Sequence, residues 1–119
     1  MFRLSGSVVA WYQVSETESG TGDVGQEIIV RTLPRGGRKL DMDLPLTYGL
    51  AALAVRADGA VAWILSTGGR YAEVDKVDSK RREPTPLSYA RNIDSSSLRV
   101  DNDSVDWREA GASRSAPLR

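Results

Sequence analysis

The stretch that decides the fold is residues 53–63, which read LAVRADGAVAW. A short apolar segment leads to Asp58 and Gly59, and a second apolar segment then ends at Trp63. Asp-Gly tolerates the positive φ angles of a tight hairpin turn, and the flanking segments are short enough to be strands. The stretch therefore predicts a β-hairpin.

The same pattern occurs twice more, in residues 2–11 and 98–107. Each copy has an apolar-Arg-apolar segment, a polar turn, and a second segment that ends in Val-X-Trp. Trp11, Trp63 and Trp107 lie 52 and 44 positions apart, which matches the roughly 40 to 50 residues of a four-stranded propeller blade. We therefore expect repeated blades, with the three tryptophans in equivalent buried positions between neighbouring sheets.

The segments between the hairpins supply the remaining strands of each blade, which we expect at residues 26–33, 39–44, 70–77 and 87–91. Residues 39–44 alternate polar and apolar side chains, as in a strand with one buried face. Residues 50–56 are rich in Leu and Ala and would also suit a helix, but their place in the repeat predicts a strand.

Residues 15–25 and 79–86 are polar and contain Gly or Pro, which predicts two long exposed loops. The apolar segments are all short and bounded by turn residues, so no helix longer than about two turns is expected. The 119 residues suit one all-β domain. We divide it into units 1–48, 49–93 and 94–119, which correspond to about two and a half to three antiparallel four-stranded propeller-type blades.

Composition restricts the chemistry that the chain could perform. It contains neither Cys nor His, so disulfides, thiolate nucleophiles, imidazole bases and Cys/His zinc sites are excluded. The 16 Lys and Arg balance the 16 Asp and Glu, and no net field favours nucleic acid or an anionic membrane. No apolar run is long enough to cross a bilayer and no export signal is visible. We expect no cofactor, no nucleic-acid partner and no membrane partner, and assign no compartment.

Three motifs look like ligand sites but are better explained as loops or turns. Residues 20–25 spell the dinucleotide motif G-x-G-x-x-G, but a β-branched run rather than a helix follows. Asp101, Asp103 and Asp106 resemble the start of a calcium loop that lacks its central Gly and final Glu. Residues 35–39 and 80–82 are short basic clusters that fit exposed loops. We therefore expect no metal site and assign no catalytic or cofactor-binding residue.

The repeated hairpins resemble those of actinobacterial β-propeller-like repeat proteins of uncharacterised function. Residues 53–63 are similar to the penultimate blade of such proteins, and residues 93–100, 104–107 and 114–119 are similar to their C-terminal end. This resemblance implies a fold and no active-site residues. A complete propeller has at least four blades, so the resemblance implies a partial propeller or one that an oligomer completes.

Two functional classes are compatible with this sequence. The first is a non-catalytic binding or scaffold module whose loops meet a protein or carbohydrate partner. The alternative is a carboxylate-dependent hydrolase or lyase at a propeller axis, with Tyr48, Tyr89 and Asp94 as candidates. Because about three blades leave sheet edges open, we also expect self-association. A dimer would close a ring of about five or six blades, with residues 113–118 pairing near residues 2–4.

Overall fold

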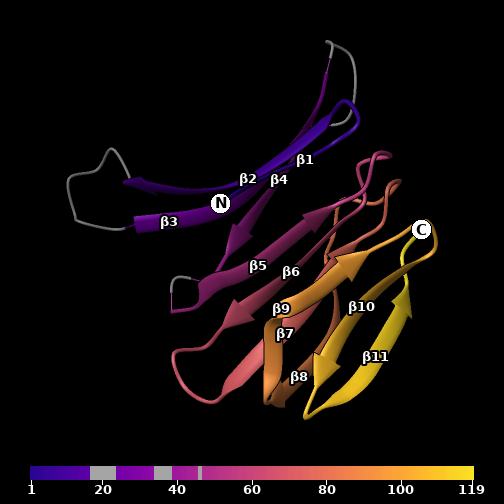
Figure 1. Cartoon of the computed structure of the whole chain (residues 1–119). Helices are drawn as coiled ribbons and strands as arrows, with labels where there is room; N and C mark the ends of the chain where they lie inside the picture. The colour runs from indigo at the N-terminus through magenta and orange to yellow at the C-terminus, as the bar shows by residue number, and fades with distance from the viewer. Residues whose placement is uncertain (17–23, 34–38, 46) are drawn as a thin grey trace.

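The computed structural model describes residues 1–16, 24–33, 39–45 and 47–119, which form eleven β-strands and no helix. The strands make three separate antiparallel sheets in chain order (Figure 1). Sheet A contains β1 (Phe2–Ser5), β2 (Val8–Glu16), β3 (Val24–Thr32) and β4 (Lys39–Leu44); sheet B contains β5 (Gly49–Val55), β6 (Val61–Ser66), β7 (Tyr71–Val77) and β8 (Thr85–Arg91); sheet C contains β9 (Ile93–Val100), β10 (Ser104–Glu109) and β11 (Ala112–Pro117). The all-β class is confirmed, and none of the three sheets closes on itself.

Each sheet is a meander in which every strand pairs with the next one along the chain. The predicted hairpins are β1–β2, β5–β6 and β9–β10. The segment that would also have suited a helix is the strand β5. β5 contributes to the core on both faces of sheet B. Leu53 packs in the cluster shared with sheet A, and Ala52 packs in the cluster shared with sheet C. Packing on two faces therefore decides against the helix propensity of Leu and Ala.

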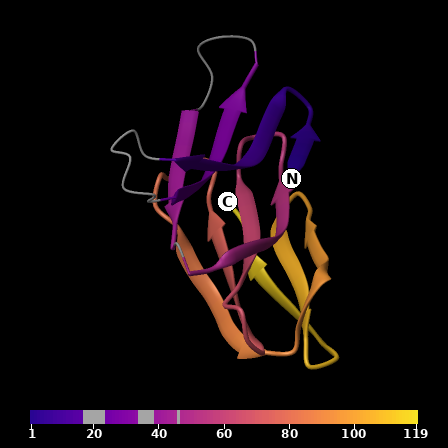
Figure 2. The ribbon, with the colours of Figure 1, turned by 90° about the vertical axis from the view of Figure 1, so that its left-hand side faces the viewer.

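Sheet B lies between the other two sheets, as Figures 1 and 2 show. One core cluster joins sheets A and B, with Val8, Ile28 and Val30 on one side and Trp63 on the other. A second cluster joins sheets B and C. Alternation is complete in β4, where every second residue is buried. The central strand β6 is buried from Val61 to Leu65, because it has a sheet on each face.

The turn between β1 and β2 requires glycine at position 6. Gly6 has a φ of +57°, which L side chains rarely adopt, and a Cβ atom at Gly6 would lie 3.3 Å from the Cβ of Ala57. Ala57 follows β5 in the next sheet. The glycine therefore allows both the turn and the close approach of sheets A and B.

Two expectations need correction. Trp63 and Trp107 are buried, at 2% and 5% exposure, but Trp11 is only half-buried. It lies on the outer face of sheet A, which no other described sheet covers. The loop predicted at 79–86 is shorter, because Pro86 is already in β8 and lies opposite Asp75. Proline is tolerated there because β8 is an edge strand and needs only one set of ladder hydrogen bonds.

No helix among the described residues is long and apolar enough to cross a membrane. Of the loop predicted at 15–25, residues 17–23 lie outside the described residues, while β2 extends to Glu16 and β3 begins at Val24. The dinucleotide spelling at 20–25 and the basic cluster at 35–39 also fall largely outside them.

Candidate functional site

The first strand of each sheet borders a groove of about 430 Å³. β1 and β9 both contact β5, and each of the three strands is hydrogen-bonded to a partner on one side only. Residues 51–55 of β5 form the floor of the groove, with Arg3 and Leu4 on one flank. Ser95, Ser96 and residues 98–100 of β9 lie on the other flank. Three edge strands thus meet at one open surface.

The flanks of the groove carry positive charge. Arg3 and Arg99 both line it, and the described residues that line it include no carboxylate. Arg3 donates from Nε to the Leu53 carbonyl at 3.0 Å and from Nη1 to the Phe2 carbonyl at 2.9 Å. Arg99 donates from Nη1 to the carbonyls of Ser96 and Leu98. A guanidinium has five N–H donors, so each side chain retains donors for an anionic group.

The arginines follow the repeat. Arg3 in the first hairpin reaches Leu53, in the first strand of the next sheet. Arg56 in the second hairpin reaches the carbonyls of Asp101 and Asn102, in the turn of the next sheet. Arg99 in the third hairpin bonds within its own strand. Two arginines therefore bind sheet to sheet, and the third lies exposed beside the groove.

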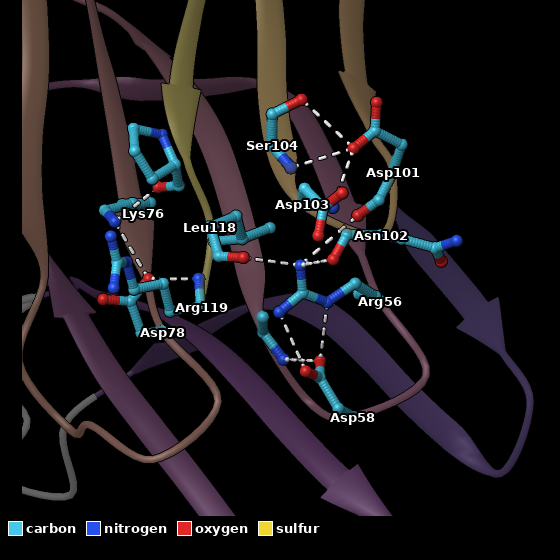
Figure 3. Close-up of polar contacts among 12 residues, drawn as sticks. Arg56, Asp58, Lys76, Asp78, Asp101, Asn102, Asp103, Ser104, Leu118 and Arg119 are labelled. Atoms are coloured by element: carbon cyan, nitrogen blue, oxygen red, sulfur yellow. Dashed lines mark hydrogen bonds and ion pairs between the residues drawn. The ribbon is translucent and has the colours of Figure 1, made fainter.

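A cluster of polar contacts joins sheet B to the C-terminal segment (Figure 3). The Arg56 guanidinium also donates to the Leu118 carbonyl at 2.6 Å, while its other face pairs with Asp58 at 2.8 Å. Lys76 donates from Nζ to the Pro117 carbonyl at 2.5 Å and pairs with Asp78 at 2.9 Å. Charge-assisted bonds of this kind are stronger than neutral ones. This cluster fastens the end of the chain to sheet B.

The ionisation states of Asp58 and Asp78 fit this structural role. The hydrogen bond from Arg56 lowers the pKa of Asp58. Burial opposes ionisation of Asp78, but hydrogen bonds from the Arg119 amide and Lys76 outweigh it and lower the pKa of that carboxyl. Both groups are therefore held as carboxylates and accept hydrogen bonds, which is the state that a structural ion pair requires.

A different carboxyl lies in the core between sheets A and B. Asp75 is 5% exposed and lies opposite Trp63 across the β6–β7 ladder. Burial, followed by the nearby carboxylate of Glu73, raises the pKa of Asp75 to about 7. The Trp63 indole N–H is buried and has no hydrogen-bond partner. Trp11 and Trp107 donate to Gln13 and Glu109, two residues further on.

The sequence of the middle repeat explains why the Trp63 indole N–H is unpaired. The residue two positions after Trp63 is Leu65, which is fully buried in the core of sheets A and B. Its side chain cannot accept a hydrogen bond. The middle repeat therefore has an apolar side chain where the outer two have an acceptor, and Trp63 is held by packing alone.

The three catalytic candidates from the sequence lie on different elements. Tyr48 precedes β5 and packs partly buried against the core of sheets A and B. Tyr89 in β8 is 58% exposed and stacks on Tyr71, with ring centroids 5.1 Å apart. Asp94 in β9 is exposed, and hydrogen bonds from the Ser96 hydroxyl and amide lower its pKa. No hydrogen bond or ring contact among the described residues joins these three side chains.

The calcium-like aspartates occupy a turn and a sheet surface. Asp101 accepts hydrogen bonds from the Asp103 and Ser104 amides, which lower its pKa and close the β9–β10 turn. Asp106 accepts from the hydroxyls of Ser104 and Ser115. Across the described ranges, no group of three or more acidic side chains is placed to hold a metal ion. These residues therefore act as turn and sheet acceptors.

The groove was not predicted from the sequence, although one signal for it was present. Arginine occurs between apolar residues at the same place in each hairpin. An arginine side chain at this position of an edge strand can lie along the open side of the sheet. Recognising the groove also required the stacking of β1, β5 and β9, which lie about one blade length apart in the chain.

A comparison of the chain with protein-family models, with curated proteins and with solved structures finds no match.

Proposed function

We propose that this protein is a non-catalytic binding module built from propeller-type blades, and that the groove over β1, β5 and β9 is its ligand site. Three features support the blade arrangement: meanders in chain order, face-to-face stacking, and a tryptophan on the second strand of each sheet that faces the preceding sheet where there is one. The first strands of neighbouring sheets are in contact, β1 with β5 and β5 with β9, as expected for blades arranged around a common axis.

The observation that carries the ligand assignment is the pair Arg3 and Arg99 on opposite flanks of the groove. Both retain unused guanidinium donors, and Ser95 lines the groove on the same flank as Arg99. The floor, residues 51–55, is made of Ala, Leu and Val. The edge strands can also add a strand to the sheet. These properties fit an extended acidic peptide segment, with its backbone along an edge and its carboxylates on the two arginines.

The experiment is a titration with a synthetic peptide of alternating Glu and Val, followed by backbone amide chemical shifts. Binding should shift the amides of Ala54, Ser95 and Ser96, and the same peptide with Gln in place of Glu should bind at least tenfold more weakly. Replacing both groove arginines (Arg3→Gln with Arg99→Gln) should produce a similar loss. Salt should weaken binding as well, since the contacts are exposed ion pairs.

The matched control is Arg82→Gln, which removes an exposed arginine from the segment between β7 and β8, outside the groove. This variant should bind the peptide like the parent protein. Shifts confined to the β7–β8 connection, or equal binding of the Glu and Gln peptides, would contradict the assignment. Circular dichroism of each variant verifies that the sheets are intact.

A further inference from the structure

The outer face of sheet A carries an apolar strip. Cross-strand pairing places Phe2 opposite Trp11 and Leu4 opposite Val9, and Trp11 lies opposite Ile29 on the next strand. Directly paired residues share one face of a sheet, so these five side chains lie together. Phe2 is 60% exposed and Leu4 is 65% exposed. The opposite face, with Val8 and Ala10, is already buried against sheet B.

The repeat shows what this kind of face contacts elsewhere in the molecule. Trp63 is the equivalent of Trp11 in sheet B, and it packs against the inner face of sheet A. Trp107 is the equivalent in sheet C, and it packs against sheet B. At both positions an apolar sheet face covers the tryptophan, which is then at most 5% exposed. The strip around Trp11 thus has the composition of a sheet-to-sheet interface but lacks the covering sheet.

The outer face of sheet C, at the other end of the stack, is polar. It carries Arg99 from β9, Asp106 and Arg108 from β10, and Ser113 and Ser115 from β11, as the register of these strands requires. Packing this face onto Phe2 and Leu4 would take charged groups out of water, which is costly even where opposite charges lie across from each other, as Asp106 and Arg99 do. A head-to-tail contact between copies is therefore unfavourable. Among the described sheet faces, the apolar one that remains uncovered is the strip itself.

We propose that a second copy of this chain covers the strip, with sheet A packed on sheet A about a two-fold axis. A two-fold interface is self-complementary and brings the same patch from both copies together. Apart from Ile29 on β3, the strip lies over β1 and β2, while β3 and β4 carry charges of both signs on this face, including the Arg31–Asp41 pair at 2.6 Å. The apolar strips meet at the centre of the interface, and the charged halves form its rim.

Leu4 borders both the strip and the groove, whereas Phe2, Val9, Trp11 and Ile29 belong to the strip alone. The proposed dimer therefore does not depend on the acidic-peptide groove. Its first test is sedimentation of the intact protein over a wide concentration range. The parent protein should form a concentration-dependent dimer. The variant with Phe2→Lys and Leu4→Lys should remain monomeric, while Ser113→Lys on the outer face of sheet C should dimerise like the parent. Phe2 and Leu4 are more than half exposed, so the double variant should keep its fold.

The second test uses the absence of native cysteine. A Leu4→Cys variant should oxidise to a covalent dimer, because a two-fold axis through the strip brings the two copies of position 4 close together. A Ser113→Cys variant should form no such dimer under the same conditions. A monomeric parent protein at all concentrations would overturn the proposal. So would cross-linking that occurs only when the Leu4→Cys and Ser113→Cys variants are mixed, since that outcome indicates a head-to-tail ring.

Discussion

The guanidinium of Arg56 donates a hydrogen bond of 2.6 Å to the carbonyl oxygen of Leu118, 62 residues further along the chain. Arg56 lies just after β5 in sheet B, and Leu118 follows β11 in sheet C. The same guanidinium holds the β9–β10 turn through the carbonyls of Asp101 and Asn102. One side chain therefore secures both the turn and the end of sheet C, which is the smallest of the three sheets.

Replacing this side chain (Arg56→Met) should destabilise the protein by about 2 to 4 kcal/mol, because the variant loses charge-assisted bonds and leaves carbonyl groups unpaired. Urea unfolding followed by tryptophan fluorescence measures the change. The matched control is Arg114→Met, since the Arg114 side chain is 57% exposed and its contact with Glu109 is 3.6 Å long. That substitution should cost less than about 0.5 kcal/mol. Equal effects of the two substitutions would show that Arg56 does not hold sheet C to sheet B.

The tryptophans should respond unequally to truncation. Trp63→Ala should cost about 3 to 5 kcal/mol, since it removes a large side chain from the centre of the core. Trp11→Ala should cost less than about half of that in the monomer, because Trp11 is only half-buried on an uncovered face. The measurement is the free energy of unfolding at a protein concentration low enough to exclude dimers. A loss below 1 kcal/mol for Trp63→Ala would contradict the assigned packing.

Asp75 should make stability depend on pH in an unusual direction. Its pKa is raised from 3.8 to about 7 by burial and by Glu73, so the folded state binds a proton that the unfolded state has already released. The stabilisation is complete below pH 4 and is lost as the pH rises toward 7, with a slope of at most about 1.4 kcal/mol per pH unit. Thermal unfolding between pH 4.5 and 8 measures it.

The isosteric variant Asp75→Asn provides the control for that profile. Its side chain cannot ionise, so stability between pH 4.5 and 7 should become nearly flat, and at pH 8 the variant should exceed the parent protein. Asp58 and Asp78 have lowered pKa values. Their contribution is lost only as the pH falls below about 4, the region where free aspartate titrates. An unchanged slope in the Asp75→Asn variant would assign the pH dependence to another group.

Two glycine substitutions should separate a required glycine from a tolerant one. Gly6→Ala should lower the free energy of unfolding by about 1 to 2 kcal/mol. The alanine backbone would have to keep a φ of +57°, and its methyl group would lie 3.3 Å from the Cβ atom of Ala57. Gly69→Ala places its methyl group in open space with no positive φ and should change stability by less than about 0.5 kcal/mol. Melting temperatures of the two variants test this. A neutral Gly6→Ala variant would show that the two sheets can separate at this point.

The strands, the turns and their grouping could be predicted from the sequence because they depend on neighbouring residues. Residues 39–44 show the alternation of a half-buried strand, and Asp58 and Gly59 supply the turn between β5 and β6. The spacing of the tryptophans indicated repeated units. These are local properties, since turn geometry and the two-residue period of a strand are set over a few residues.

The tertiary structure decided which repeated positions are buried and which surfaces remain open. Trp11 and Trp63 occupy the same place in the repeat, yet only Trp63 has a sheet in front of it. Arg3 and Arg99 likewise share a motif, but they flank one groove only because β1, β5 and β9 come together. The pattern of a sequence specifies which face of a strand is apolar. Whether that face is covered depends on the number and order of the stacked sheets, because burial is a property of the assembled layers and not of any single strand.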